Sequence, residues 1–277
     1  MPATNRPRPN DDQRRRWNDD YWASTWPSRV PLTAQATPLV LDAAALRAGE
    51  AVLDIGSGTG ETTVAAAQRV GNDGKATGAD ISTPLVDHAR RAAARQSAAN
   101  CWFVVADVQA DPIPGAPYDA AISQFGVMFF DDPIAAFANV RDHGVAGGRL
   151  VFACWRSAAE NPWHNAHVLG AFAPPAPPPA PGAHPTGPFA FADDVEVAAI
   201  LDKAGWRDAR LDAVDLRVAL ERDVLLDEGA FAYAGVPEER LDDAREAADA
   251  YYARFTRDDG RLEVPLAFWI ASAVTPG

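Results

Sequence analysis

The stretch that decides the fold is Val52-Leu53-Asp54-Ile55-Gly56-Ser57-Gly58-Thr59-Gly60-Glu61-Thr62. Its first part is a mainly apolar run that is typical of a buried parallel strand. Three glycines then recur at every second position, which is typical of a turn that lets a ligand approach its backbone, because glycine leaves the peptide uncovered and free to take positive φ. We expect a helix to start directly after this turn, so that its free N–H groups point at the ligand.

The spacing of the glycines separates two classes of cofactor. The dinucleotide fingerprint is G-x-G-x-x-G, in which the third glycine allows close packing of the helix beside a pyrophosphate. Here the third glycine comes one residue early, at Gly60, and Glu61 follows it. Glu61 and Asp54 would both repel a diphosphate, whereas a carboxylate suits a ligand that carries an ammonium group. A nucleotide-dependent oxidoreductase is therefore the less favoured alternative.

The D-x-G-x-G-x-G run that starts at Asp54 resembles motif I of the class I S-adenosylmethionine (SAM)-dependent methyltransferases. The resemblance implies that the strand-end acid and the glycine turn hold the methionine half of SAM. It covers residues 50–156 well, and within the class it is closest to small-molecule methyltransferases similar to those of ubiquinone and menaquinone biosynthesis. Residues 124–130 lack the N-P-P-Y type of run found in amide- and nucleobase-directed N-methyltransferases, so those substrates lose support.

Length, charge and cysteine content exclude several classes of function. With 277 residues, the chain can form one large α/β domain with insertions or with a small lid. A net charge of −13 argues against a nucleic-acid partner and against an anionic membrane surface. Two cysteines cannot build a zinc site, and we expect no metal. Without an apolar run long enough to span a membrane or a secretory signal, we expect a cytoplasmic protein with a small-molecule substrate; its oligomeric state is left open.

Strands and helices alternate through the first half of the chain, and two further strands are expected near its end. This pattern predicts an α/β fold with a doubly wound, mostly parallel seven-stranded sheet of the class I methyltransferase type, with N-terminal helices and a helical, proline-rich lid. The strands are expected at 50–55, 75–80, 101–105, 118–123, 149–155, 206–218 and 264–274. A Gly147-Gly148 turn is expected just ahead of the fifth strand.

The chain divides into a core and several additions. The eight prolines of residues 173–188 favour either a flexible surface loop or part of a lid. Within the core, we expect one helix over 31–47 before the first strand. The expected units are an N-terminal tail (disordered over 1–12) and aromatic helix (1–30), a SAM-binding Rossmann-like core (31–156), a proline-rich insertion (157–190), a core helix and strand (191–218), a helical lid (219–262) and a last strand (263–277).

Polar residues arrive together at the carboxyl ends of the predicted strands, the edge where open α/β sheets bind ligands. The resemblance implies that Asp80 accepts from the ribose hydroxyls of SAM and that Asp107 accepts from the adenine amine. Each of these acids could instead only cap a turn or a helix. The predicted cofactor-binding residues are Asp54, Gly56, Ser57, Gly58, Gly60, Thr62, Asp80, Ile81, Ala106, Asp107, Val108, Ser123, Gln124 and Phe125.

The acceptor side is less well defined by the sequence. Methyl transfer from a sulfonium requires mainly that the protein binds the donor, aims the acceptor and excludes water. His164 is the best-placed candidate for a catalytic base, with a packing role as the alternative. Arg156 could meet an acidic substrate or form a salt bridge. The aromatic side chains favour a planar, apolar substrate and are Trp22, Trp26, Phe125, Trp155 and Trp163. The expected products are the methylated acceptor and S-adenosylhomocysteine (SAH); a SAM-fold protein using the cofactor for a non-methylating reaction is the alternative.

Overall fold

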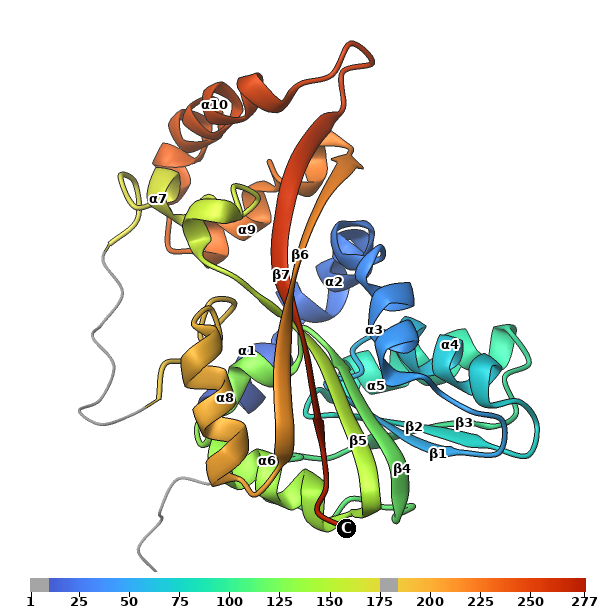
Figure 1. The fold of residues 1–277 in the computed structure, drawn as a ribbon. Coiled ribbons are helices and arrows are strands. Elements are labelled where there is room, and N and C mark those ends of the chain that lie inside the picture. The colour runs from blue at the N-terminus through green and yellow to red at the C-terminus, as the bar shows by residue number, and fades with distance from the viewer. Residues whose placement is uncertain (1–9, 175–183) are drawn as a thin grey trace, which may run out of the picture.

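The computed structural model describes residues 10–174 and 184–277, and a seven-stranded sheet forms its centre (Figure 1). The order of the strands in the sheet is β3-β2-β1-β4-β5-β7-β6. Their bounds are β1 Ala51–Ile55, β2 Lys75–Asp80, β3 Cys101–Val105, β4 Tyr118–Gln124, β5 Gly144–Trp155, β6 Arg207–Leu220 and β7 Leu262–Val274. The pairs among β1 to β5 are all parallel, and β7 runs antiparallel to both β5 and β6. The predicted mostly parallel, seven-stranded sheet is therefore confirmed.

Helices cover both faces of this sheet. On one side α3, α4 and α5 pack on the strands, and on the other side α6 and α8 do so (Figure 1). The bounds of the helices are α1 Asp11–Trp17, α2 Asp20–Thr33, α3 Ala36–Ala44, α4 Glu61–Val70, α5 Thr83–Arg95, α6 Pro133–Asp142, α7 Ala166–Leu169, α8 Asp194–Lys203, α9 Glu228–Tyr233 and α10 Leu241–Tyr252. No helix among the described residues is long and apolar enough to cross a lipid bilayer.

Local sequence explains why these elements start and end where they do. Helix α3 buries Ala36, Val40, Leu41 and Ala44, which recur at helical spacing and pack into the main apolar core. Helix α5 begins after Ser82, whose side chain accepts the backbone N–H of Leu85. These packed helices hold the carboxyl ends of β1, β2 and β3 in fixed positions at one edge.

The strands β6 and β7 extend beyond the rest of the sheet as a two-stranded ribbon. Residues 268–274 of β7 pair with both β5 and β6, whereas residues 262–267 pair with β6 and not with β5. The upper part of this ribbon carries α9 and α10, and α7 packs against α10 (Figure 1). The helical unit after residue 219 is thus attached to the sheet through β6 and β7.

The N-terminal helices differ from the prediction in two ways. The expected helix over 31–47 is wrong, because α2 runs to Thr33 and a separate α3 starts at Ala36. The expected disorder over residues 1–12 is wrong for its last residues, because Asn10 is buried by side-chain contacts described below and α1 begins at Asp11. Residues 1–9 lie outside the described part of the chain, as do residues 175–183 of the proline-rich insertion.

Two features within the parallel half also differ from expectation. The connection between β3 and β4, residues 106–117, contains no helix; three prolines among these residues disfavour one. Strand β5 starts at Gly144, ahead of the Gly147-Gly148 pair that was expected to be a turn outside the strand. Gly147 has a φ of 71°, and the register with β4 shifts between Tyr118 and Ala120, so the glycines form an irregularity inside the strand.

Candidate functional site

A cavity of about 200 Å³ lies over the carboxyl ends of β1, β2 and β4, at the point where the strand order reverses. Residues from the predicted site line it together with parts of α1, α2 and α3. Those predicted from sequence that line the cavity are Asp54, Gly56, Ser57, Gly58, Thr62, Asp80, Ile81, Ala106, Asp107, Val108, Gln124, Phe125 and Trp26. The structure therefore brings the three strand-end acids to one cavity.

The glycine turn lies against a second backbone segment and leaves no room for side chains there. A Cβ on Gly56 would be 2.9 Å from the Cα of Gly126, and φ at Gly56 is 66°. A Cβ on Gly58 would be 3.2 Å from Nε1 of Trp26, whose ring lies over the turn. The turn therefore presents backbone to the cavity, and Trp26 forms the wall opposite it.

Asp80 connects the glycine turn to the start of α5. Its carboxylate accepts the N–H of Gly58 on one oxygen and the N–H of Ser82 on the other, both at 2.8 Å. Burial raises the pKa of Asp80, and these two hydrogen bonds oppose that rise. Each oxygen keeps a further lone pair, so the carboxylate can also accept from a ligand in the cavity.

Asp54 and Glu61 make this end of the cavity negative. Burial raises the pKa of Asp54 to about 7, although the hydroxyl of Thr63 donates to its carboxylate at 2.6 Å. The charges of Asp80 and Glu61 add to that rise. Glu61 also lines the cavity and accepts from the hydroxyl of Thr59 at 2.6 Å. Three carboxylates around one glycine turn repel a diphosphate and attract a cationic group.

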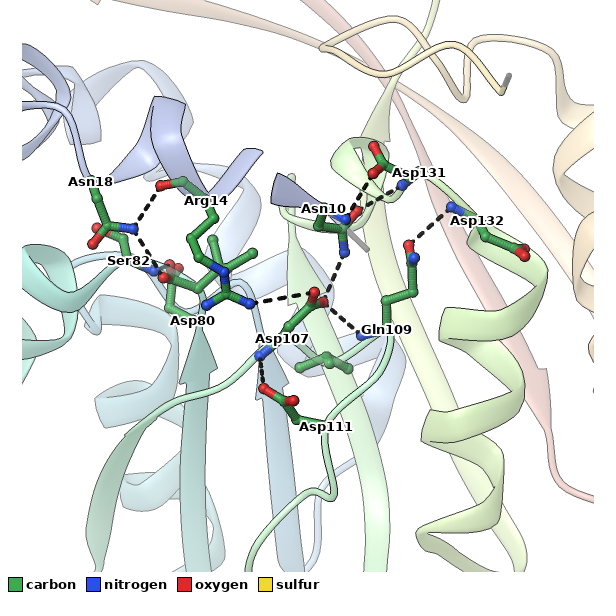
Figure 2. A network of polar contacts seen from close by, with 12 residues as sticks. Asn10, Arg14, Asn18, Asp80, Ser82, Asp107, Gln109, Asp111, Asp131 and Asp132 are labelled. Carbon is green, nitrogen blue, oxygen red and sulfur yellow. Dashed lines mark hydrogen bonds and ion pairs between the residues drawn. The ribbon is translucent and has the colours of Figure 1, made fainter. Parts of the chain in front are cut away.

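Asp107 is held by the N-terminal segment of the chain. Its Oδ1 accepts from Nδ2 of Asn10 at 2.8 Å and from the N–H of Gln109 at 3.1 Å. Nη2 of Arg14 lies 3.7 Å from its Oδ2. Figure 2 shows Asn10 and Arg14 directed at this carboxylate from above the strand ends. Oδ1 is therefore saturated by the chain, and Oδ2 retains acceptor capacity.

Further contacts fix α1 as a cover on the cavity, a feature that sequence reasoning missed. Asn10 also exchanges two hydrogen bonds with Asp131, and Ser82 donates to the carbonyl of Trp17 (the Asn10 contacts are drawn in Figure 2). Gln13 and Trp17, four residues apart on α1, line the cavity. No pattern in the sequence singled out Asn10 or Gln13.

The far end of the cavity is formed by the residues that follow β4. Oε1 of Gln124 accepts from Thr37 at 2.7 Å and from Thr62 at 3.2 Å, and its Nε2 donates to the carbonyl of Thr33. Phe125 adopts a φ of 59° and stacks on Trp155 with ring centroids 4.0 Å apart. An apolar ring thus forms part of the cavity wall just beyond the end of β4.

Two predicted cofactor residues do not line the cavity. Ser123 is fully buried, and its hydroxyl donates to the carbonyl of Ile55 at 2.7 Å while accepting the N–H of Gly126 at 3.2 Å. It therefore braces the glycine turn from below. Gly60 faces Phe103 and Ala89 at the start of α4.

Most of the predicted substrate residues also lie away from the cavity. Trp155 lies behind Phe125, and Trp163 contacts Trp155 with centroids 4.7 Å apart. Trp22 packs between Trp17 and Tyr233. Trp155 and Trp163 thus form an aromatic layer behind Phe125. Of the predicted set, only Trp26 and Phe125 line the cavity itself.

Arg156 is already paired within the protein. Its guanidinium binds Asp215 at 2.9 Å and also Glu160, and it lies over the ring of Trp269. Of the two alternatives open from sequence, the structure favours the salt bridge, because Arg156 does not line the cavity.

His164 lies beyond the aromatic layer. Its ring contacts Phe189 with centroids 4.9 Å apart and Trp163 at 5.5 Å, and it does not line the cavity. Burial lowers the pKa of His164, and the positive charges of His167 and Arg16 lower it further. The imidazole is therefore neutral at pH 7. No group of three or more His, Cys, Asp or Glu among residues 10–174 and 184–277 is arranged to hold a metal ion.

Comparison with known proteins finds a described family that is similar to the centre of this site. The family model, for a methyltransferase domain, matches residues 52–148, which include the glycine turn, Asp80 and Asp107. The match covers β1 through the start of β5, the half of the sheet that carries the strand-end acids.

Two curated relatives match about two fifths of the chain. An aklanonic acid methyltransferase of a Streptomyces species is 34% identical over 104 residues, which are 38% of this chain and 47% of the relative. A ubiquinone/menaquinone biosynthesis C-methyltransferase of a Marinomonas species is 36% identical over 107 residues, 38% of this chain and 43% of the relative. The chain thus spans less than half the length of either relative.

Solved structures share the fold over most of the chain. A SAM-dependent methyltransferase of Aquifex aeolicus matches with a TM-score of 0.51 and 16% identity, covering 95% of this chain and 98% of that one. The 4+2 cyclase SpnF matches with a TM-score of 0.52 and 19% identity, covering 87% and 81%. The fold is therefore that of the class I methyltransferases, and this fold also occurs in a protein named for another reaction.

Proposed function

We propose that this protein transfers a methyl group from SAM to a small, planar, apolar acceptor by in-line displacement. One observation carries the proposal: Asp54, Asp80 and Asp107 reach a single cavity beside a glycine turn that exposes backbone to it. This donor and acceptor set fits the cofactor, because SAM has an ammonium, a ribose diol and an adenine amine that each require an acceptor. The same set fits a dinucleotide poorly, since its diphosphate would meet Asp54 and Glu61.

Each part of the cofactor has a proposed partner in the cavity. Asp54 and the backbone of residues 56–60 bind the amino-acid end, where Ser57 also offers a buried hydroxyl that lacks a partner within the described protein. Asp80 accepts from the ribose hydroxyls, and Oδ2 of Asp107 accepts from the adenine amine. The apolar walls of the ring site are Ile81, Ala106 and Val108.

The bound cofactor supplies a methyl group that its sulfonium has already activated. The chain therefore mainly positions the acceptor and shields the reacting groups from water. Trp26 and Phe125 exclude water at the end of the cavity nearest the aromatic layer. His164 is the proposed base, because its neutral imidazole can accept a proton at pH 7 from an acceptor that extends through this layer. The two relatives are named for aklanonic acid and for ubiquinone and menaquinone, which supports a small-molecule acceptor.

Calorimetric titration tests the cofactor assignment directly. SAM and SAH should both bind the purified protein with 1:1 stoichiometry, and a reduced nicotinamide dinucleotide should not bind. The absence of SAH binding, or tighter binding of the dinucleotide than of SAH, would refute the proposal.

A label-transfer experiment separates methyl transfer from a non-methylating use of the cofactor. The protein is incubated with methyl-labelled SAM and fractionated small-molecule extract, and both label and SAH are followed. Transfer of label to a small molecule with equimolar release of SAH supports the proposal. If the protein binds SAH and converts a compound while all label stays on SAM, the result supports the non-methylating alternative.

A further inference from the structure

Arg16 lies next to the cofactor cavity on the side away from β1. It belongs to α1, whose Trp17 lines the cavity. Its guanidinium carbon is 5.7 Å from the ring centroid of Trp17, 5.4 Å from that of Trp22 and 5.9 Å from that of Phe129. Phe129 also lines the cavity. The rings of Trp17 and Phe129 therefore contact both the Arg16 guanidinium and the cofactor cavity.

The described residues place no counter-ion next to this guanidinium. Its Nε is buried and makes no hydrogen bond within the described protein, and no carboxylate of the described residues lies within ion-pair distance of it. Residues 1–9 and 175–183 contain no Asp or Glu, so they cannot supply one. Neighbouring arginines differ: Arg14 faces Asp107, and Arg29 lies 3.2 Å from Asp227.

Holding an unpaired guanidinium in this place costs free energy. Burial lowers the pKa of Arg16, which shows that the site disfavours its charge. The three rings recover part of that cost through cation–π contacts, but they do not satisfy the buried N–H on Nε. A carboxylate would satisfy both the charge and the donors, usually through two parallel hydrogen bonds.

The ionisable side chains that interact with Arg16 include the Tyr233 phenol of α9 and the imidazole of His164, whose pKa is lowered partly by Arg16 itself. The indole N–H of Trp22 is a second buried donor without a partner in the described protein. This neighbourhood of rings, an unpaired guanidinium and an unused indole donor is suited to an aromatic anion.

We propose that Arg16 binds the carboxylate of the methyl acceptor, and that the acceptor is an aromatic carboxylic acid whose rings pack on Trp17 and Phe129. This inference rests on the proposed methyltransferase function and names its substrate class. Arg16 takes the place of Arg156 as the residue that recognises an acidic substrate, because Arg156 is already paired with Asp215. Because Trp17 and Phe129 also line the cofactor cavity, a ring system packed on them lies beside the cofactor.

Matched acid and amide probes test the charge requirement. Benzoate, 2-naphthoate and anthraquinone-2-carboxylate, each with its neutral primary amide, are titrated calorimetrically into SAH-saturated protein. We expect at least one acid to bind roughly 10- to 100-fold more tightly than its amide, the range for a hydrogen bond to a charged group. No preference for acid in any pair, or no binding of any acid, would overturn the inference.

Two variants assign that preference to a residue. Arg16→Met keeps an apolar side chain among the rings and should remove the acid preference while SAH affinity is unchanged. Arg15→Met makes the same change in charge on the same helix, at an exposed residue paired with Asp12, and should keep the preference. A preference that survives Arg16→Met overturns the inference. An Arg16→Met variant that weakens acid and amide equally identifies a structural role and also overturns it.

The SAH titration keeps the two proposals apart. Wild-type protein that does not bind SAH refutes the proposed function, whatever the acids do. Wild-type protein that binds SAH without distinguishing acid from amide refutes only the assignment of Arg16. Thermal unfolding of each variant, which checks that it is folded at the temperature of the titration, completes the comparison.

Discussion

Removal of the Asp80 carboxylate should weaken cofactor binding far more than it weakens folding. Asp80→Ala removes the proposed acceptor for both ribose hydroxyls. A hydrogen bond to a charged group contributes roughly 1.5–3 kcal/mol, so two lost contacts correspond to roughly 3–6 kcal/mol, or about 10²- to 10⁴-fold in the dissociation constant of SAH.

The same substitution also destabilises the fold, and the assay must separate this effect from the loss of SAH binding. The N–H groups of Gly58 and Ser82, each 2.8 Å from the carboxylate, lose their acceptor. A buried donor left without a partner costs roughly 1–3 kcal/mol, although water in the emptied space can replace the oxygen. We therefore expect a lower unfolding temperature as well as weaker SAH binding, and calorimetry must be run well below that temperature.

A matched control removes a carboxylate of similar size from a site without cofactor contacts. Asp87 lies on α5, is about half exposed and pairs with Arg90. Asp87→Ala makes the same change in net charge and should leave SAH affinity unchanged. If Asp80→Ala stays folded and binds SAH within about threefold of wild type, a factor worth well under 1 kcal/mol, the reasoning about Asp80 is wrong.

Three further predictions concern other parts of the site. Gly126→Ala should lower the free energy of unfolding by roughly 1–3 kcal/mol, measured in urea, because its Cβ would be 2.7 Å from the carbonyl oxygen of Ile55; an unchanged midpoint would contradict this. SAH affinity should rise from pH 6 to pH 8, because the ammonium of SAH binds the ionised form of Asp54, whose pKa is about 7. Below that pH the Asp54 carboxyl carries a proton, which must be released when SAH binds. Calorimetry in buffers of different ionisation enthalpy should detect that proton, and Asp54→Asn should abolish the pH dependence. With the acceptor found by label transfer, kcat/KM should rise with pH and reach a plateau at or below pH 6.5, because burial lowers the pKa of His164. His164→Gln should remove this rise with pH and lower the rate roughly 10²- to 10⁴-fold. An unaltered pH profile in that variant excludes His164 as the base.

The parallel half of the fold and the acidic edge could be predicted because they depend on local pattern. Apolar strands that end in Asp54, Asp80 and Asp107 alternate with helices, and parallel strands place those ends at one edge whatever the loops do. The glycine spacing is equally local. These residues line one cavity as the pattern indicated.

The cover of the cavity could not be predicted, because it depends on contacts distant in sequence. Asn10 meets Asp107 across 97 residues, and Asn10 stands in a polar stretch that has no periodicity. Arg156 is neutralised by Asp215, which is 59 residues away. The insertion of β7 between β5 and β6 likewise depends on antiparallel pairing that no turn specifies.

That insertion has a consequence for synthesis of the protein. Strand β6 has β7 as its one partner in the described sheet, and β7 also completes the edge of β5. Until residues 262–274 have left the ribosome, both edges expose backbone groups that can pair with another nascent chain. The parallel half can form early, whereas the acceptor side must wait for β7, so premature termination before residue 262 should yield aggregation-prone fragments rather than a smaller enzyme.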